Sequence, residues 1–118
     1  MSKILFILND PPYGTERAYN ALRLAINVLK KDPSTEMRVF LVGDAASCAK
    51  AGQTLPQGYY NLETMLTVVA KRGGTVGVCG TCMDARGLKD GDLAEGARRS
   101  SLDEMTEWTL WADKVLVF

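Results

Sequence analysis

The sequence predicts an α/β protein with a mostly parallel sheet of four or five strands and helices on both faces. Two observations carry this prediction: strand-like and helix-like segments alternate along the chain, and the four clear strands are continuous apolar runs. Strands that are apolar along their whole length are buried on both faces, which is typical of parallel sheets covered by helices. At 118 residues, the chain is expected to form one domain over residues 1–118.

The predicted strands are short apolar runs bounded by turn residues. Their length and their lack of alternation indicate strands that lie inside the sheet with no face in water. In chain order, the four runs are Lys3–Leu8, Met37–Val42, Thr75–Val78 and Lys114–Phe118.

Two amphipathic helices are predicted between the first three strands. Thr15 is the expected N-cap of the first, whose apolar residues recur with helical spacing until Lys31, before Asp32-Pro33. Asn61 is the expected N-cap of the second, which ends at the basic, glycine-terminated segment 71–74.

The remaining segments give weaker patterns. A small helix is predicted over 45–51 with Asp44 as its cap, and 53–60 is predicted to be a loop. Residues 88–99 are charged and interrupted by glycine, and we expect a short helix or two turns there. The capping-box pattern at 101–104 opens a last helix.

Composition argues against several classes of partner. Lys plus Arg (14) equals Asp plus Glu (14), so there is no electrostatic case for nucleic acid or an anionic membrane surface. The apolar run at the start is too short for a secretion signal, and no run approaches the roughly 20 residues that span a bilayer. We therefore expect a cytoplasmic location, where thiols stay reduced.

The segment Cys79-Gly80-Thr81-Cys82 is the strongest functional signal in the chain. It directly follows a predicted strand, and ligands collect at the carboxyl ends of strands in open α/β sheets. Two of the three cysteines lie here and the chain has no histidine, which favours sulfur as the reacting atom. The remaining cysteine, Cys48, lies among alanines and is expected to be a small buried side chain.

Three kinds of chemistry fit Cys79 and Cys82: a nucleophilic thiol that carries sulfur as a persulfide, a dithiol–disulfide redox pair, or half of a metal site. A thiolate is favoured at a helix N-terminus, where Arg86 would support it and Asp84 would oppose it. Structural zinc needs four ligands, and this chain supplies one cysteine pair. We therefore predict no metal and no cofactor.

The loop that follows the first strand has two interpretations. Asp10, Tyr13 and Arg17 could line a pocket at the end of that strand, with helix amides behind them to hold an anion. The same residues also fit a rigid turn followed by a helix cap. Neither a dinucleotide fingerprint nor a Walker loop is present.

Taken together, several motifs resemble the DsrE/DsrF-like family of small sulfur-relay proteins, which includes the YchN-type members. They occur in order along nearly the whole chain: Asn9–Gly14 after the opening strand, Val39–Asp44, Val78-Cys79 followed by Ala85-Arg86-Gly87, and Trp111–Val115. The resemblance implies a three-layer α/β/α sandwich that assembles as homotrimers or homohexamers. It also implies a persulfide on Cys79, exchanged with sulfur donor and acceptor proteins. Cys82 departs from the pattern, because sulfur-relay subunits need no second cysteine there.

The leading hypothesis is a sulfur carrier or sulfurtransferase-like protein. Cys79 would accept sulfane sulfur, and Cys82 would act as the resolving or second carrier thiol. Asp10, Tyr13 and Arg86 are predicted to shape the substrate pocket. The alternatives are a dithiol–disulfide oxidoreductase and a non-enzymatic oligomeric module that binds a metal or small ligand. Both a catalyst and a passive carrier fit the sequence.

Overall fold

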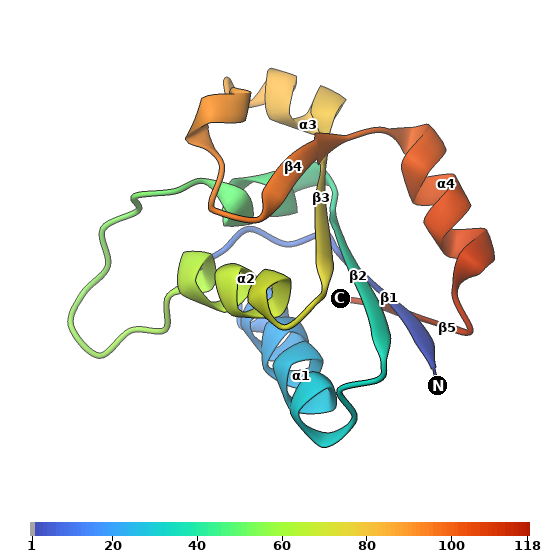
Figure 1. Cartoon of the computed structure of the whole chain (residues 1–118). Coiled ribbons are helices and arrows are strands. Elements are labelled where there is room, and N and C mark those ends of the chain that lie inside the picture. The colour runs from blue at the N-terminus through green and yellow to red at the C-terminus, as the bar shows by residue number, and fades with distance from the viewer. Residues whose placement is uncertain (1) are drawn as a thin grey trace.

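In a computed structural model, which describes residues 2–118, five strands form a single sheet (Figure 1). Their spatial order is β4-β3-β2-β1-β5, and each neighbouring pair is parallel. This arrangement confirms the predicted parallel α/β architecture. The strands are β1 (Lys3–Leu8), β2 (Glu36–Leu41), β3 (Thr75–Cys79), β4 (Ala97–Ser100) and β5 (Lys114–Val117).

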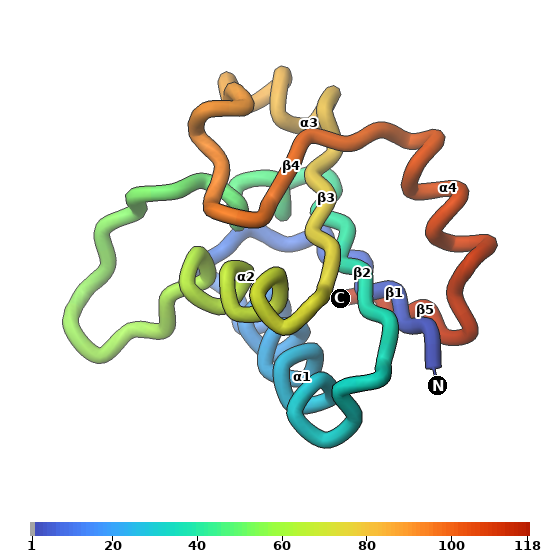
Figure 2. The backbone as a smooth tube through the Cα atoms, in the orientation of Figure 1, coloured from blue at the N-terminus to red at the C-terminus, as the bar shows by residue number. Residues whose placement is uncertain are grey.

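Helices cover both faces of the sheet. Helices α1 (Arg17–Lys31) and α2 (Leu62–Lys71) pack together on one face, and α4 (Leu102–Trp111) lies on the other (Figures 1 and 2). The short helix α3 (Gly80–Ala85) continues directly from β3. Within residues 2–118, no helix is both long enough and apolar enough to cross a membrane.

Alternate residues of each central strand feed two separate cores. In β1, Phe6 and Leu8 face the core beneath α1 and α2, whereas Leu5 and Ile7 pack with Phe40 and the α4 side chain Trp108. The rings of Phe40 and Trp108 meet edge to face with centroids 5.9 Å apart. Because both faces are covered, both sets of side chains are apolar, which explains the continuous apolar runs of the central strands.

The predicted cap of the first helix is wrong by one residue. Helix α1 begins at Arg17 with Glu16 in the N-cap position, and Glu16 makes no side-chain capping bond. The Thr15 hydroxyl instead donates to Asp10 Oδ2 at 3.2 Å and accepts from the Arg17 amide at 3.4 Å. Thr15 therefore closes the preceding loop rather than capping the helix.

The prediction for 88–99 is correct only for the first part of this segment, because its end supplies a fifth strand. A short 3₁₀ turn (Asp90–Asp92) is followed by β4, which pairs with β3 so that Val78 lies opposite Arg99 and Cys79 opposite Ser100. Arg98 and Arg99 are exposed on this edge strand. An edge strand that faces solvent needs no apolar run, so the sequence carries no strand signal there.

The small helix after β2 forms as a 3₁₀ helix over Gly43–Ala49, slightly before the predicted 45–51. It follows directly from β2, close to the end of β3, which it contacts along with α3. The carboxyl ends of β2 and β3 therefore share one edge of the molecule, as the sequence predicted.

Candidate functional site

The cysteine pair, Cys79 and Cys82, lies where β3 becomes α3. Cys79 is the last residue of β3 and also the N-cap residue of α3, so the predicted cysteine loop is largely a helix. Cys79 is 9 % exposed and packs with Phe40 and Trp108, whereas Cys82 is half-buried. The strand thus fixes one sulfur, and the first turn of the helix fixes the other.

Of the two thiols in the pair, Cys79 is the one whose ionised form is stabilised. Burial disfavours ionisation, but hydrogen bonds from the Cys82 thiol, the Thr81 hydroxyl and the amides of both residues outweigh it. As a result, the pKa of Cys79 lies below its ordinary value. The Thr81 Oγ1 atom is 3.3 Å from Cys79 Sγ. This arrangement places donors from the first turn of a helix on a strand-end sulfur, which is how reactive cysteines are activated.

Cys82 has the opposite tendency. Burial, followed by the hydrogen bond with Cys79, raises the pKa of Cys82 above its ordinary value. The Gly43 amide donates to Cys82 Sγ at 3.1 Å and Arg86 is nearby, yet these contacts do not reverse the shift. Of the two thiols, Cys79 is therefore the easier to ionise, and Cys82 keeps its proton to higher pH.

Arg86 lies on the Cys82 side of the pair. Its guanidinium donates to the Cys82 carbonyl at 3.0 Å and forms a salt bridge to Asp44 with Nη2 2.6 Å from Oδ1. The predicted role of Asp44 as a helix cap is wrong: the 3₁₀ helix has Val42 in its N-cap position, with no side-chain capping bond. Asp44 instead ties the loop after β2 to α3.

Asp10 and Tyr13 form bonds away from the cysteine pair. Asp10 Oδ2 accepts from Thr15 and is 3.7 Å from Arg17 Nε, while the Tyr13 hydroxyl accepts from the Leu62 amide at 3.2 Å. These bonds anchor the loop to α1 and to the start of α2. The structure therefore groups Cys79, Cys82 and Arg86, and gives Asp10 and Tyr13 partners within the loop and helices.

Arg99 is a site residue that the sequence analysis missed. A Cβ placed on Gly80 would lie 2.8 Å from Arg99 Nε and 3.0 Å from Cζ, so the guanidinium rests against the residue that joins Cys79 to α3. Arg99 also donates to both carboxylate oxygens of Asp84, at 3.0 and 2.8 Å. The one signal that could have located it is the β–α alternation, which requires a strand after α3.

Cys48 lies outside the cysteine pair and is fully buried, as predicted. Its thiol donates to the Asp10 carbonyl at 3.5 Å. Burial, and next the nearby Asp10 carboxylate, raise the pKa of Cys48 to about 12. Cys48 therefore stays protonated at neutral pH and is chemically inert in the folded protein.

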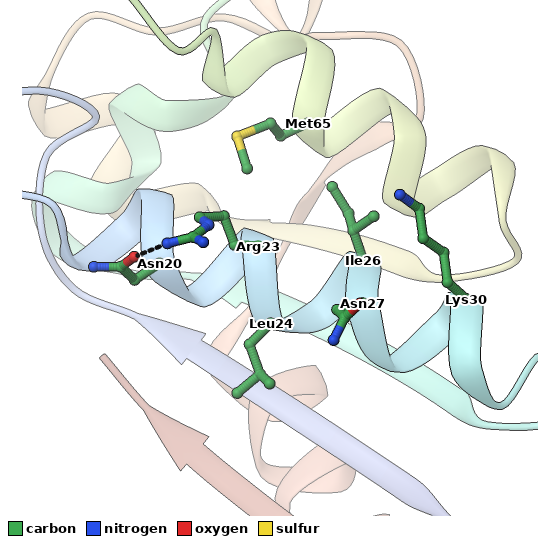
Figure 3. Close-up of a pocket in the computed structure, with 7 residues that line it drawn as sticks. All are labelled: Asn20, Arg23, Leu24, Ile26, Asn27, Lys30 and Met65. Carbon is green, nitrogen blue, oxygen red and sulfur yellow. Dashed lines mark hydrogen bonds between the residues drawn. The ribbon is translucent and has the colours of Figure 1, made fainter.

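A hollow of about 550 Å³ lies elsewhere, over α1 and α2 (Figure 3). Six of its seven lining residues come from α1, and Met65 reaches in from α2. None of them belongs to the carboxyl edge of the sheet, so this hollow is separate from the cysteine pair.

Metal binding was one alternative for the pair. Across residues 2–118, no group of three or more His, Cys, Asp or Glu side chains is arranged to hold a metal ion. The acidic groups nearest the pair, Asp44 and Asp84, are each bonded to an arginine. We assign no metal ligand and no cofactor-binding residue.

The fold and the site define a class: small α/β/α sandwich proteins with a hydrogen-bonded cysteine pair at the carboxyl edge of a parallel sheet. Comparison with known proteins gives the family. The model of the DsrE/DsrF-like family matches residues 2–118, and the chain belongs to this family.

Relatives match over almost their full length. The protein YchN of Escherichia coli is 39% identical over 118 residues, covering 100% of both chains, and MK0008 of Methanopyrus kandleri is 34% identical over 115 residues, covering 98% of this chain and 93% of the relative. The crystal structure of YchN from E. coli superposes with a TM-score of 0.95 over 100% of both chains. MTH1491 of Methanobacterium thermoautotrophicum has a TM-score of 0.80 over 100% of both chains at 12% identity, which supports the fold alone.

Proposed function

We propose that this protein is a sulfur carrier or sulfurtransferase-like protein that holds sulfane sulfur as a persulfide on Cys79. The observation that carries the proposal is the cysteine pair at the junction of β3 and α3, where the Thr81 Oγ1 atom lies 3.3 Å from Cys79 Sγ. The directions of the pKa shifts, lowered for Cys79 and raised for Cys82, agree with it. Membership of the DsrE/DsrF-like family supports a role of the sulfur-relay kind.

The first step is a sulfur transfer to Cys79. The Cys79 thiolate attacks the terminal sulfur of a donor persulfide, R–S–SH. A new S–S bond forms to give Cys79–S–SH, the donor S–S bond breaks, and R–S⁻ leaves. The Cys82 thiol, which interacts with Cys79 without a covalent bond, would protonate the leaving sulfur.

The second step has two outcomes. An acceptor thiolate can take the terminal sulfur, which restores the Cys79 thiolate and leaves the acceptor as a persulfide. Alternatively, the Cys82 sulfur attacks Cys79 Sγ, so that a Cys79–Cys82 disulfide forms and H₂S is released.

A dithiol–disulfide oxidoreductase is the second candidate function. It is supported by the CxxC spacing, which places both cysteines in the first turn of α3. In that function Cys79 would attack a substrate disulfide and Cys82 would resolve the mixed disulfide.

The proposal extends to partners and location. Donor and acceptor proteins would deliver and remove the sulfur, and the subunits would assemble as a homotrimer or homohexamer, as the family resemblance implies. The three cysteines are free thiols, which suits the reducing cytoplasm.

Intact mass spectrometry after anaerobic incubation with hydrogen polysulfide tests the proposal. Wild type and Cys82→Ala are expected to gain one sulfur atom per chain, and Cys79→Ser to gain none. Cys48→Ser is the matched control, because its thiol is buried, and it should gain sulfur as wild type does.

Two results would contradict the proposal. If Cys79→Ser gains sulfur as readily as wild type, Cys79 is not the acceptor. If Cys82→Ala, which has no resolving thiol, gains no sulfur while wild type alternates between dithiol and disulfide forms, the oxidoreductase function replaces the relay.

A further inference from the structure

We infer that Arg99 and Asp84 form a charge latch, an exposed ion pair beside Cys79 whose balance of charge sets how readily anionic sulfur donors react there. The sulfur part of this inference rests on the proposed function, whereas the charge preference applies to any reagent that attacks the thiolate. Neither residue carried a predicted role in binding.

The latch is built from two elements that meet at the cysteine pair. Arg99 comes from β4, whose register places it opposite Val78, one residue before Cys79. Asp84 comes from the last turn of α3. Their bidentate hydrogen bonds, 3.0 and 2.8 Å long, tie the edge strand to the helix that carries Cys82.

Gly80 brings the guanidinium close to the nucleophile. Every other side chain at this position would carry a Cβ that lies 2.8–3.0 Å from the Nε, Cζ and Nη2 atoms of Arg99. Because Gly80 has no side chain, the positive charge rests directly on the backbone that follows Cys79. The hydrogen bonds to Asp84 are the main cause that raises the pKa of the Arg99 guanidinium, and the negative charge of the Cys79 thiolate acts in the same direction as a smaller cause.

The latch is accessible from solvent. The Arg99 side chain is 40% exposed and that of Asp84 is 61% exposed, so both charged groups are open to an incoming donor. While Arg99 and Asp84 are hydrogen-bonded to each other, their charges cancel. An anionic donor that bonds to Arg99 would compete with Asp84, so the aspartate sets how strongly the arginine attracts anions.

The test compares two alkylating reagents of similar size, neutral iodoacetamide and negatively charged iodoacetate. Each reacts with the thiolate, so the ratio of their rates at Cys79 cancels the extent of ionisation and reports the local charge. The Cys79 adduct is identified by peptide mass spectrometry.

Charge removal should move the iodoacetate-to-iodoacetamide ratio in opposite directions. Arg99→Gln leaves the aspartate uncompensated and should lower the ratio about fivefold, while Asp84→Asn frees the arginine and should raise it about fivefold, the effect of one charge at contact distance in water. The double variant should return to the wild-type ratio. Arg99→Lys should keep most of the ratio.

Arg98→Gln is the matched control. Arg98 is the preceding residue of β4, carries the same charge, and pairs with Glu104 of α4 rather than with α3. Its removal changes the net charge equally and should leave the ratio unchanged. An unchanged ratio in Arg99→Gln, or an equal change in Arg98→Gln, would overturn the inference.

The sulfur arm separates this inference from the proposed function. The rate at which hydrogen polysulfide, itself an anion, loads Cys79 should fall in Arg99→Gln by more than the rate with iodoacetamide. A wild-type protein that fails to take sulfur would contradict the proposed function, yet the alkylation ratios would still decide on the latch.

Discussion

At the scale of single residues, Cys79 owes its chemistry to its membership of two elements. As the last residue of β3 it is held by the sheet, and as the N-cap residue of α3 it lies beside the first turn of that helix, with the Thr81 Oγ1 atom 3.3 Å from its Sγ. The first amides of a helix have no hydrogen-bond partner within the helix, so a negative charge placed near them is stabilised. A rigid position and a stabilised anion are thus obtained from the same residue.

Replacement of Cys82 tests the polarity of the pair. Cys82→Ala removes a hydrogen-bond donor from Cys79, so the pKa of Cys79 should rise. Fewer thiolates would be present at pH 7, and alkylation of Cys79 by iodoacetamide should become slower there than in wild type. The measurement is the alkylation rate as a function of pH.

At high pH the two proteins should differ less, because Cys79 is ionised in both. Cys48→Ala is the control, since it removes a thiol that does not bond to Cys79. An equal or lower midpoint of the pH profile in Cys82→Ala would show that Cys82 does not activate Cys79.

At the scale of elements, β3 and α4 depend on a close approach at Gly77. A Cβ at this position would lie 2.9 Å from the Trp108 ring and 3.2 Å from Ser100 Cβ. Trp108 also packs edge to face on Phe40 and shares a core with Cys79. The absence of a side chain at Gly77 therefore allows α4 to cover the sheet behind the cysteine pair.

Gly77→Ala should destabilise the protein through this contact. Trp108 would have to shift, and overpacking of this kind costs about 1–3 kcal/mol in the free energy of unfolding. Denaturant unfolding followed by tryptophan fluorescence measures the change.

Gly91→Ala provides the comparison, because a Cβ there meets nothing within 4 Å and Gly91 does not have a positive φ. It should be close to neutral. Equal stability of the two variants would mean that Trp108 has room to move.

The loop 53–60 and the loop after β1 are joined by aromatic packing. All four tyrosines of the chain gather here, and the rings of Tyr19 and Tyr60 stack with centroids 4.0 Å apart. The Tyr13 hydroxyl also accepts from the Leu62 amide at the start of α2. Tyr13 thus holds a loop and a helix together, and its role in shaping a substrate pocket stays a prediction.

Tyr13→Phe separates the two roles. Loss of the hydroxyl leaves the Leu62 amide without its partner, and the free energy of unfolding should fall by about 1 kcal/mol. Sulfur loading of Cys79 at a temperature where the variant is folded should match wild type. A slower loading rate at unchanged stability would instead support the predicted role of Tyr13 in shaping the substrate pocket.

At the scale of the whole molecule, the face that carries α4 leaves apolar side chains in water. Leu102 is 73% exposed, Leu110 is 82% exposed, and Val117 on the edge strand β5 is 65% exposed. Exposed apolar side chains near an edge strand are typical of surfaces that are buried by contacts between subunits. The neutral net charge does little to oppose such contacts.

A homo-oligomer is therefore expected in solution. Light scattering coupled to size exclusion should give three or six times the subunit mass of 12.9 kDa. Leu110→Asp should reduce that mass if α4 contributes to the contact, and Leu24→Asp, on α1, is the comparison. A monodisperse monomer in wild type would contradict the prediction.

The sequence by itself determined which segments form the central strands and where the cysteine pair lies along the chain. The central strands are buried on both faces, so each appears in the sequence as a run of consecutive apolar residues, as in Lys3–Leu8. The CxxC segment directly follows such a run. The positions of Cys79, Cys82 and the buried Cys48 could thus be predicted from neighbouring residues alone.

Only the tertiary structure decided which distant side chains meet at that place. Strand β4 is an exposed edge, so nothing in its own residues marks it, yet its register brings Arg99 against Gly80. Likewise, Asp44 pairs with Arg86 because β2 and β3 are neighbours in the sheet. The residue pattern of a single segment indicates whether that segment is buried. The contacts of Arg99 and Asp44 depend instead on strand order and register, which only the fold of the whole chain determines.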